Sequence, residues 1–293
     1  MRAVVTGGAG FVGSHLVDAL VARGDEVTVV DNLSTGTREH VDPQARFLEQ
    51  DIRAGFSEPA DVVFHLAAQA DVRTSVAEPA FDADVNVVGT VQVLEAARAA
   101  GARVVFASTG GAIYGECERP AREDDPRSPV SPYAVAKLAA EEYLATWNRL
   151  YGTAHVACRL GNVYGPRQRP LLEGGVVALF LDRLRAAQGT VIFGDGEQTR
   201  DFVFVGDAVD ALLAAAGARA AGVFNVCTGV GTSVLALHRL CAATLGVDRE
   251  PDFSPERPGD IRHSVLDPGL AERELGWRAA TRLPDGIART AAA

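Results

Sequence analysis

Tyr133 and Lys137 stand four residues apart in the segment SPYAVAK at 131–137. Residues at this spacing share one face of a helix, so the phenol and the ammonium can point into the same cleft. A phenol has a pKa near 10 in water, and positive charge beside it stabilises the phenolate. A tyrosine in that setting can take a proton from an alcohol while a hydride leaves the same carbon. The pair therefore predicts oxidation of a hydroxyl group, provided that a hydride acceptor is bound nearby.

Such an acceptor is indicated by the first residues, MRAVVTGGAGFVG. The apolar run 3–5 predicts a buried parallel strand, and it leads into glycines spaced as G-x-G-x-x-G and G-x-x-G-x-x-G. These glycines allow a tight turn and close approach to a pyrophosphate at the start of the following helix. Asp31 ends the next predicted strand, where it would bind the adenosine ribose and repel a 2′-phosphate. The order of these features predicts NAD rather than NADP.

A further hydroxyl is expected where another strand ends. Ser108 and Thr109 follow the apolar run 104–107. Doubly wound sheets bind ligands at the carboxyl ends of their strands, so either hydroxyl could orient the substrate.

Strands and helices alternate along the first half of the chain. We expect strands near 2–6, 26–30, 46–49, 61–65, 103–108 and 154–159, and helices near 11–23, 80–100 and 131–151. This alternation predicts an α/β fold with a Rossmann-type doubly wound parallel sheet. In the second half we expect a turn at 161–167, helices near 174–188, 207–218 and 234–245, extended segments at 190–193 and 201–205, and a proline-rich loop at 251–258.

The same pattern suggests two domains. We predict an NAD-binding Rossmann domain over 1–165, which carries Tyr133 and Lys137. A smaller C-terminal α/β lobe over 166–293 would bind the substrate, with some of its chain crossing back to the sheet.

Composition excludes several classes of protein. The chain has 293 residues, of which 47% are hydrophobic and 23% charged, as is ordinary for a globular enzyme. No apolar run reaches the roughly 18–20 residues that span a bilayer. The net charge of −10 argues against binding to nucleic acid or to an anionic membrane. The four cysteines lack the spacing of a metal site, so no metal site is expected, and they fit a reducing cytoplasm. We expect no signal peptide, because a predicted strand begins at the first residues.

An ordered set of motifs runs along nearly the whole chain: TGGAGFVGSHL at 6–16, VVDNLSTG at 29–36, Asp51-Ile52, HLAAQ at 65–69, Asn86, STGGAIYG at 108–115, SPYAVAK at 131–137, RLGNVYGPRQ at 159–168, FGDGEQTRDFVFV at 193–205 and RPGD at 257–260. With these motifs the chain resembles the extended short-chain dehydrogenase/reductase family, and within it the UDP-glucose 4-epimerase branch. The resemblance implies a cytoplasmic homodimer that binds NAD tightly and recycles it.

The resemblance also implies roles for individual residues. NAD would contact Gly7, Gly10, Phe11, Val12, Gly13, Asp31, Asn32, Ser34, Thr35, Gly36, Asp51, Ile52, Leu66, Ala67, Ala68, Gln69, Asn86, Tyr133 and Lys137. Arg73, by its charge, is a candidate partner for the carboxylate of UDP-glucuronate. The UDP-sugar would also contact Thr109, Asn162, Gly175, Val176, Val177, Arg200, Arg257, Asp260 and Ser264. Among these, arginines suit a diphosphate because their planar donors bind it bidentately.

One position departs from the family pattern. Relatives often place the catalytic Ser or Thr four residues before the Tyr-Gly pair, and here Gly110 stands there, with one extra residue at the end of the strand. We therefore assign the catalytic hydroxyl to Thr109 and keep Ser108 as the second choice.

Gly110 and Gly111 also help to choose among reactions. The similar sugar 4,6-dehydratases carry an Asp-Glu pair after the catalytic Thr, and UDP-glucuronate decarboxylases carry an acid there, whereas glycine cannot transfer a proton. Oxidation at C4, rotation of the 4-keto sugar and return of the hydride then give a 4-epimerase of the UDP-glucose/UDP-galactose type. UDP-glucuronate or UDP-N-acetylglucosamine could be the substrate instead; the small Ser264 would leave room for an acetamido group. A net nucleotide-sugar dehydrogenase or dehydratase, and a catalytically silent NAD-binding regulator, stay open.

Overall fold

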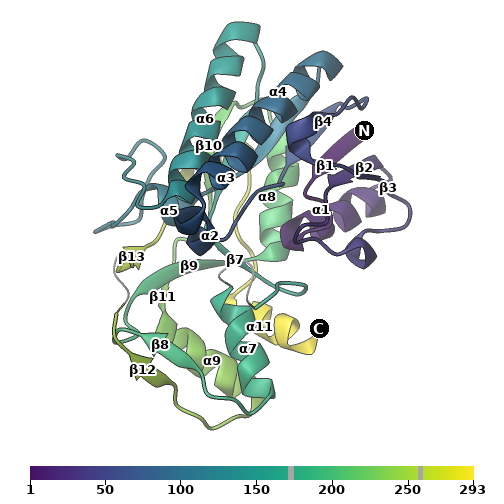
Figure 1. Ribbon diagram of the computed structural model, residues 1–293. Coiled ribbons are helices and arrows are strands. Elements are labelled where there is room, and N and C mark those ends of the chain that lie inside the picture. Colours follow the sequence, from purple (N-terminus) through teal and green to yellow (C-terminus); the bar gives the residue numbers. More distant parts are fainter. Residues whose placement is uncertain (171–174, 257–259) are drawn as a thin grey trace.

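The computed structural model describes residues 1–170, 175–256 and 260–293. Figure 1 shows a larger lobe, which holds the N-terminus, above a smaller lobe that holds the C-terminus. In the described ranges, no helix combines the length and the apolar character that crossing a membrane requires.

A parallel sheet of seven strands forms the centre of the larger lobe. Its order is β10-β6-β5-β4-β1-β2-β3, so the chain moves outward from β1 to β3 and then returns to the other side of β1. The order of strands thus reverses between β1 and β4, and ligands of such sheets bind at the carboxyl ends beside that point. The strands are β1 (Arg2–Thr6), β2 (Glu26–Asp31), β3 (Arg46–Glu49), β4 (Val62–His65), β5 (Arg103–Thr109), β6 (Val156–Leu160) and β10 (Gly222–Val226).

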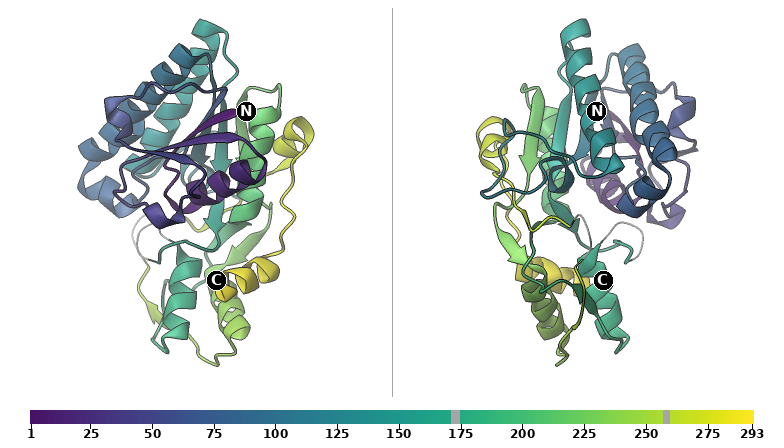
Figure 2. Two further views of the ribbon diagram at one scale, coloured as in Figure 1. Left: turned by 90° about the vertical axis from the view of Figure 1, so that its right-hand side faces the viewer. Right: turned by 60° about the vertical axis from the view of Figure 1, so that its left-hand side comes forward.

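Helices cover both faces of this sheet, as Figure 2 shows. Successive side chains of a strand point to opposite faces, so Val5 packs in a core with Leu16 and Leu212, and Val4 packs in a second core with Leu94. The predicted doubly wound α/β fold is therefore confirmed. The first core is closed by α1 (Phe11–Ala22), α8 (Val205–Gly217) and α10 (Gly269–Leu275), and the second by α4 (Gly89–Ala100) and α6 (Pro132–Tyr151). Two short helices, α2 (Val72–Ala77) and α3 (Pro79–Ala83), pack on α6.

The smaller lobe is built around a short mixed sheet. In it β9 pairs in parallel with β7 and β13 and antiparallel with β11, while β8 pairs with β12 in a separate ribbon. The strands are β7 (Asn162–Tyr164), β8 (Val191–Phe193), β9 (Thr199–Phe204), β11 (Gly231–Ser233), β12 (Asp252–Ser254) and β13 (His263–Ser264). The helices are α7 (Val176–Arg185), α9 (Val234–Leu245) and α11 (Leu283–Ala292).

Several elements differ from the sequence-based expectation. The segment 161–167 contains strand β7 rather than only a turn, because its backbone pairs with β9. The proline-rich segment 251–258 contains β12, which pairs with β8. The predicted helix 80–100 is divided into α3, a π-helical turn Asp84–Val88 and α4, and α2 before it was not predicted.

The second half of the chain contributes to both lobes. Helix α8 packs on the central sheet and β10 is its edge strand beside β6. The lobes are therefore not divided at one point along the chain, and the assignment of 166–293 to substrate binding stays a prediction.

Candidate functional site

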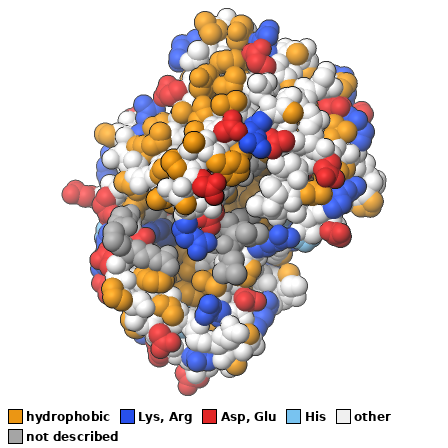
Figure 3. All heavy atoms as spheres, viewed as in Figure 1, with side chains coloured by type: hydrophobic (Ala, Val, Ile, Leu, Met, Phe, Trp, Pro, Cys, Tyr) orange, Lys and Arg blue, Asp and Glu red, His pale blue; other side chains and the backbone are white. Residues whose placement is uncertain are grey.

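A cavity lies between the lobes at the carboxyl ends of β1, β4, β5 and β6. Figure 3 shows the surface hollowed at this place. Its walls come from the glycine turn after β1, the loops after β2 and β4, the end of β5, the start of α6 and parts of β7, α7 and β9. The cavity thus occupies the position that the sheet topology predicts for a ligand.

The glycine turn forms a cradle that has no room for side chains. Gly7 has a φ of +73°, and a Cβ there would lie 2.6 Å from the backbone nitrogen of Ala67. A Cβ on Gly13 would lie 2.0 Å from the carbonyl oxygen of Gly7. The N-terminus of α1 follows at once, and its free N–H groups suit an anion. The cradle therefore fits the pyrophosphate of a dinucleotide.

Asp31 is held in place at one side of this cradle. Its Oδ2 accepts a hydrogen bond of 2.9 Å from the backbone N–H of Ala9, and its Oδ1 accepts one of 2.8 Å from Leu33. Burial raises the pKa of Asp31, and these two N–H groups oppose the rise. The carboxylate lines the cavity, so the structure places it where the sequence predicted a ribose-binding acid.

Arg53 is a cavity residue that sequence reasoning missed. It lines the same end of the cavity as Asp51, and its Nη2 lies 2.8 Å from Asp51 Oδ2. The guanidinium holds the pKa of Asp51 well below its usual range, mainly through this side-chain hydrogen bonding. The available signal was its place two residues after Asp51, in the segment expected to border the adenine.

Tyr133 and Lys137 both line the cavity from the first turns of α6. Lys137 is 3% exposed; its Nζ donates a hydrogen bond of 3.0 Å to the carbonyl oxygen of Ala107 and lies 5.9 Å from the centre of the Tyr133 ring. Burial lowers the pKa of this ammonium to about 8. The predicted pair is therefore brought together in one cleft.

The two candidate hydroxyls at the end of β5 have different surroundings. Ser108 also lines the cavity, but its side chain is buried and its Oγ donates a hydrogen bond of 2.5 Å to Glu141. Thr109 is half-buried and lines the cavity, and its hydroxyl makes no hydrogen bond within the described part of the chain. Because the Ser108 hydroxyl is already bound to Glu141, these surroundings favour Thr109 as the hydroxyl available to a substrate.

The residues after Thr109 leave no room for an acid at the first position. A Cβ on Gly110 would lie 2.2 Å from Leu266 Cδ1, so a longer side chain would displace that leucine. Gly111 lines the cavity, and a Cβ there would lie 3.3 Å from Asn162 Oδ1. Of the two positions where the resemblance places carboxylates in dehydratases, Gly110 has no room for a side chain and Gly111 carries no group that could transfer a proton.

Most of the predicted substrate-binding residues line the cavity, and Ser264 lies behind its wall. Arg200 is half-buried in the cavity wall; burial lowers its pKa, and the negative charges of Asp260 and Glu116 oppose this. Ser264 is buried behind the wall, with its Oγ 3.4 Å from the carbonyl oxygen of Gly111. Those that line the cavity are Thr109, Asn162, Gly175, Val176, Val177 and Arg200.

Arg73 is not among the residues that line the cavity. Its side chain is 76% exposed and forms an ion pair of 2.9 Å with Asp71. Asp260 is exposed. Arg257 lies outside the described residues.

Of the predicted cofactor residues, all but two line the cavity. Asn86 is buried behind it, and its Oδ1 accepts a hydrogen bond of 3.0 Å from the backbone of Gln69. Gly36 packs against the glycine turn, where a Cβ would meet Ala9 at 2.8 Å. The lining set comprises Gly7, Gly10, Phe11, Val12, Gly13, Asp31, Asn32, Ser34, Thr35, Asp51, Ile52, Leu66, Ala67, Ala68, Gln69, Tyr133 and Lys137.

His65, the last residue of β4, is buried beneath the glycine turn. Its ring nitrogens lie 2.8 Å from Thr6 Oγ1 and 3.0 Å from Thr90 Oγ1. Burial lowers the pKa of His65 to about 3, and the charge of Lys137 adds to this. The ring is therefore neutral at neutral pH.

We expect His65 to weaken the fold in acid. In the unfolded chain a histidine titrates near pH 6.5. The contribution of neutral His65 to the free energy of unfolding is therefore complete above that pH. It is lost as the pH falls toward the pKa of His65 in the folded protein, because the unfolded chain takes up the proton first. The loss should reach about 2 kcal/mol at pH 5. Denaturant unfolding of wild type and His65→Gln at about pH 7.5 and pH 5 checks this. An equal pH effect in both proteins would contradict it.

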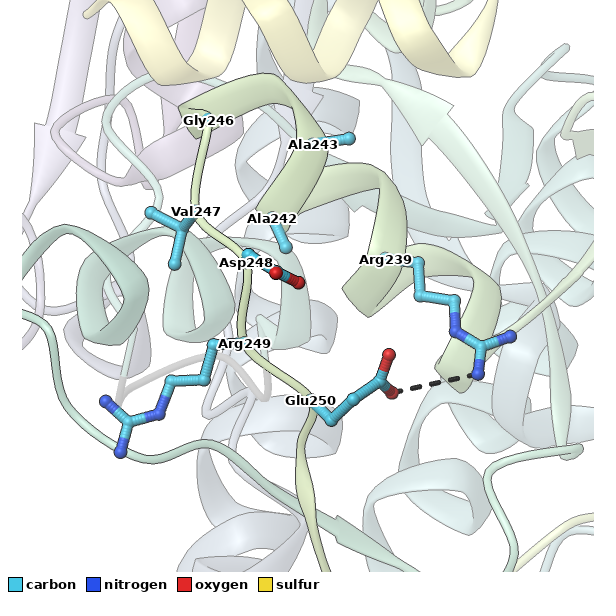
Figure 4. Close-up of a pocket in the computed structure, with 8 residues that line it drawn as sticks. All are labelled: Arg239, Ala242, Ala243, Gly246, Val247, Asp248, Arg249 and Glu250. Carbon is cyan, nitrogen blue, oxygen red and sulfur yellow. Dashed lines mark ion pairs between the residues drawn. The ribbon is translucent and has the colours of Figure 1, made fainter.

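A second hollow lies at the far end of the smaller lobe, where α9 ends (Figure 4). Arg239 and Glu250 form an ion pair of 3.7 Å across it, and both side chains are largely exposed. Exposed pairs of this kind contribute little energy. Within the described part of the chain, the hollow is lined only by residues from the end of α9 and the loop after it, and we assign it no function.

Together, the fold and the cavity define a dinucleotide-binding α/β protein with a tyrosine–lysine pair at the edge of its sheet. The NAD dependent epimerase/dehydratase family matches residues 3–227. The chain belongs to this family, as the sequence motifs predicted.

Individual relatives are similar over the full length. The chain is 47% identical to the UDP-glucose 4-epimerase of Mycolicibacterium smegmatis, over 99% of this chain and 97% of that protein. It is 44% identical to the crystal structure of UDP-glucose 4-epimerase with UDP-glucose from Thermotoga maritima, with a TM-score of 0.96 over 100% and 98% of the two chains. For the Thermus thermophilus UDP-glucose 4-epimerase complex with NAD, the identity is 41% and the TM-score 0.92, over 100% and 98%.

Proposed function

We propose that this protein is an NAD-dependent 4-epimerase that interconverts UDP-glucose and UDP-galactose. The observation that carries the proposal is that Thr109, Tyr133 and Lys137 line one cavity. In addition, Thr109 is followed by Gly110 and Gly111, at the positions where the resemblance places acids in dehydratases. The full-length similarity to UDP-glucose 4-epimerases supports it. UDP-N-acetylglucosamine and UDP-glucuronate are the alternative substrates of the same site.

The cofactor residues fit NAD. Gly7 and Gly13 would hold its pyrophosphate against the start of α1, and Asp31 would bind the adenosine ribose. When bound, NAD supplies the group that accepts the C4 hydride and gives it back. Because the hydride is returned, the cofactor is recycled and no second substrate is needed.

The protein's own residues then bind the oxygen of the sugar 4-hydroxyl and transfer its proton. Thr109 would hydrogen-bond the sugar 4-hydroxyl and orient it. Tyr133 would accept the proton of that hydroxyl as C4 is oxidised, and return it to the same oxygen after the sugar has rotated. The ammonium of Lys137 would stabilise the phenolate between these two steps.

The diphosphate would be held on the side of the smaller lobe. Arg200 presents a half-buried guanidinium to the cavity, and a buried cation favours a bound anion. Asn162 would donate an amide hydrogen bond to the same group. Val176 and Val177 at the start of α7 would line the pocket for uracil.

The proposal is tested by incubating purified protein, without added cofactor, with each of the three UDP-sugars. NMR should show UDP-galactose forming from UDP-glucose, and denatured protein should release NAD. In a parallel incubation with added NAD, accumulation of NADH in proportion to product would instead identify a dehydrogenase, and loss of water would identify a dehydratase. Bound NAD without turnover of any sugar, with or without added NAD, would leave a regulator. Turnover of another sugar alone would change the substrate and keep the reaction.

We include a homodimer and a cytoplasmic location in the proposal. Helices α2, α3 and α6 pack together, and Figure 3 shows hydrophobic side chains gathered over this side of the molecule. The exposed apolar residues of these helices include Val76, Val135 and Leu150. Apolar side chains that share one face suit a protein interface. Sedimentation velocity should give twice the chain mass of 30.8 kDa, and a single-chain mass would remove the dimer. Cell fractionation tests the location.

A further inference from the structure

A buried carboxylate lies directly behind the cavity wall. Asp82 belongs to α3, which packs against α6 (Figure 1), and its side chain is 1% exposed. The π-helical turn that carries Asn86 begins two residues later. Such turns are rare and often occur at functional sites. A carboxylate is costly to bury without compensation, so its negative charge needs a partner.

Two amides fix one oxygen of this carboxylate. Gln69 Nε2 and Asn86 Nδ2 donate to Asp82 Oδ1 at 2.8 Å and 3.0 Å. The second N–H of Gln69 goes to the carbonyl oxygen of Asp71, and that of Asn86 goes to the carbonyl oxygen of Gln69. Neither amide therefore has a hydrogen left for the other carboxylate oxygen.

That other oxygen, Oδ2, is buried and has no hydrogen-bond partner among the described residues. If Asp82 were protonated there, its O–H would need an acceptor. An ionised oxygen needs only positive charge nearby. Burial raises the pKa of Asp82, and Gln69, Asn86 and the charge of Lys137 oppose that rise.

The other buried carboxylate near Lys137 already has its own cation. Glu141 lies one turn further along α6, and Arg159 donates to both of its oxygens, from Nε to Oε1 at 3.0 Å and from Nη2 to Oε2 at 2.7 Å. Ser108 adds a third hydrogen bond. Because this pair is balanced within itself, the buried charges left on the packed helices α3 and α6 are those of Asp82 and Lys137. These two charges are not joined by an ion pair within 4 Å and interact through space.

We propose that Asp82 is a positioning residue whose carboxylate is the buried counter-ion of Lys137 and keeps that ammonium charged beside Tyr133. Through Gln69 the same carboxylate also fixes the loop after β4, which forms part of the cavity wall. The effect on catalysis rests on the proposed epimerase function. The coupling between the two charges does not.

Lys137 is sensitive to this charge because its pKa is already close to neutrality. Burial lowers the pKa to about 8, while Asp82 and then Glu141 raise it. Without the charge of Asp82, the ammonium should lose its proton at a lower pH and support the phenolate less well. The titratable and charged groups whose charges act on Lys137 are Asp82 on α3, Tyr133 and Glu141 on α6, His65 on β4 and, through Glu141, Arg159 on β6.

The coupling can be measured directly because Lys137 is the only lysine in the sequence. Protein labelled with ¹³C,¹⁵N-lysine gives one side-chain Cε resonance, which NMR follows from about pH 6 to about pH 11. Asp82→Asn keeps an oxygen for Gln69 and Asn86 and removes the charge. Its lysine midpoint should fall by about one pH unit. Glu78→Gln, which removes an exposed carboxylate four residues earlier, should leave the midpoint unchanged.

Kinetics give a second measurement. At about pH 8.5 the kcat of Asp82→Asn should fall about tenfold, with the KM for UDP-glucose unchanged, and Asp82→Glu should restore both the midpoint and kcat. If Asp82→Asn does not fold, Asp82→Ser carries the same expectations. A midpoint equal to that of wild type overturns the proposal, whatever the activity. A shifted midpoint in a protein whose wild type does not epimerise would overturn the proposed function and leave the coupling intact.

Discussion

Replacing Tyr133 by phenylalanine is expected to lower kcat by about 100- to 10,000-fold, the range that a positioned proton acceptor contributes. The substitution removes one oxygen and keeps the ring, so the start of α6 should pack as before. The KM for UDP-glucose should change little, because the lost interaction is made while the proton moves and not when the sugar binds. NMR progress curves over a range of UDP-glucose concentrations give both constants.

Tyr143→Phe is the matched control for this change. Tyr143 lies on the same helix, is 40% exposed and packs edge-on against Trp147, away from the cavity. It loses the same oxygen and should keep the wild-type kcat. A Tyr133→Phe enzyme within tenfold of wild type would show that another group takes the proton.

The sequence predicted the position of this tyrosine because the start of α6 is encoded locally. Ser131 Oγ accepts a hydrogen bond of 3.2 Å from the backbone N–H of Ala134, and Pro132 occupies the first helical turn. Both residue types favour a helix start. Once the helix begins there, the four-residue spacing places Tyr133 and Lys137 on one face.

Elements that depend on distant partners were harder to predict. Strand β10 pairs with β6, more than sixty residues earlier in the chain, and nothing in its five residues indicates that partner. Strand β7 lies between two glycines that suggest a turn, and only its pairing with β9 makes it a strand. The π-helical turn interrupts a segment whose apolar pattern continues through it, so a single helix was the natural interpretation.

The same distinction applies to the site. Residues that belong to a local motif, such as the glycine turn and Asp31, line the cavity as the sequence predicted. Asp82 and Arg53 matter through contacts with residues far away in the sequence or on other elements, and no motif marks them. Arg73 was expected at the substrate because of its charge, and the structure places it in an exposed ion pair.

Adding a single methyl group at Gly13 should strongly lower the affinity for NAD and weaken the fold. In Gly13→Ala the new Cβ would lie 2.0 Å from the carbonyl oxygen of Gly7, 2.8 Å from its carbonyl carbon and 2.9 Å from Gly8 Cα. All three are backbone atoms, so no side-chain rotation can relieve the clash. The same Gly7 oxygen accepts the hydrogen bond from Gly10 that closes the turn. The cradle must therefore open, and its N–H groups leave the position of the pyrophosphate.

We expect Gly13→Ala to lower the free energy of unfolding by about 3 kcal/mol, as overpacking of a rigid site does, and NAD affinity by at least about 100-fold. Gly217→Ala is the matched control, because a Cβ at that exposed residue of α8 meets no atom within 4 Å. It should be neutral or slightly stabilising, since alanine favours a helix over glycine. Denaturant unfolding and the NAD content of each purified protein measure both effects. Normal NAD content in Gly13→Ala would mean that the turn can widen without losing the cofactor. The close approach of the Gly13 backbone to Gly7 would then not be required for NAD binding.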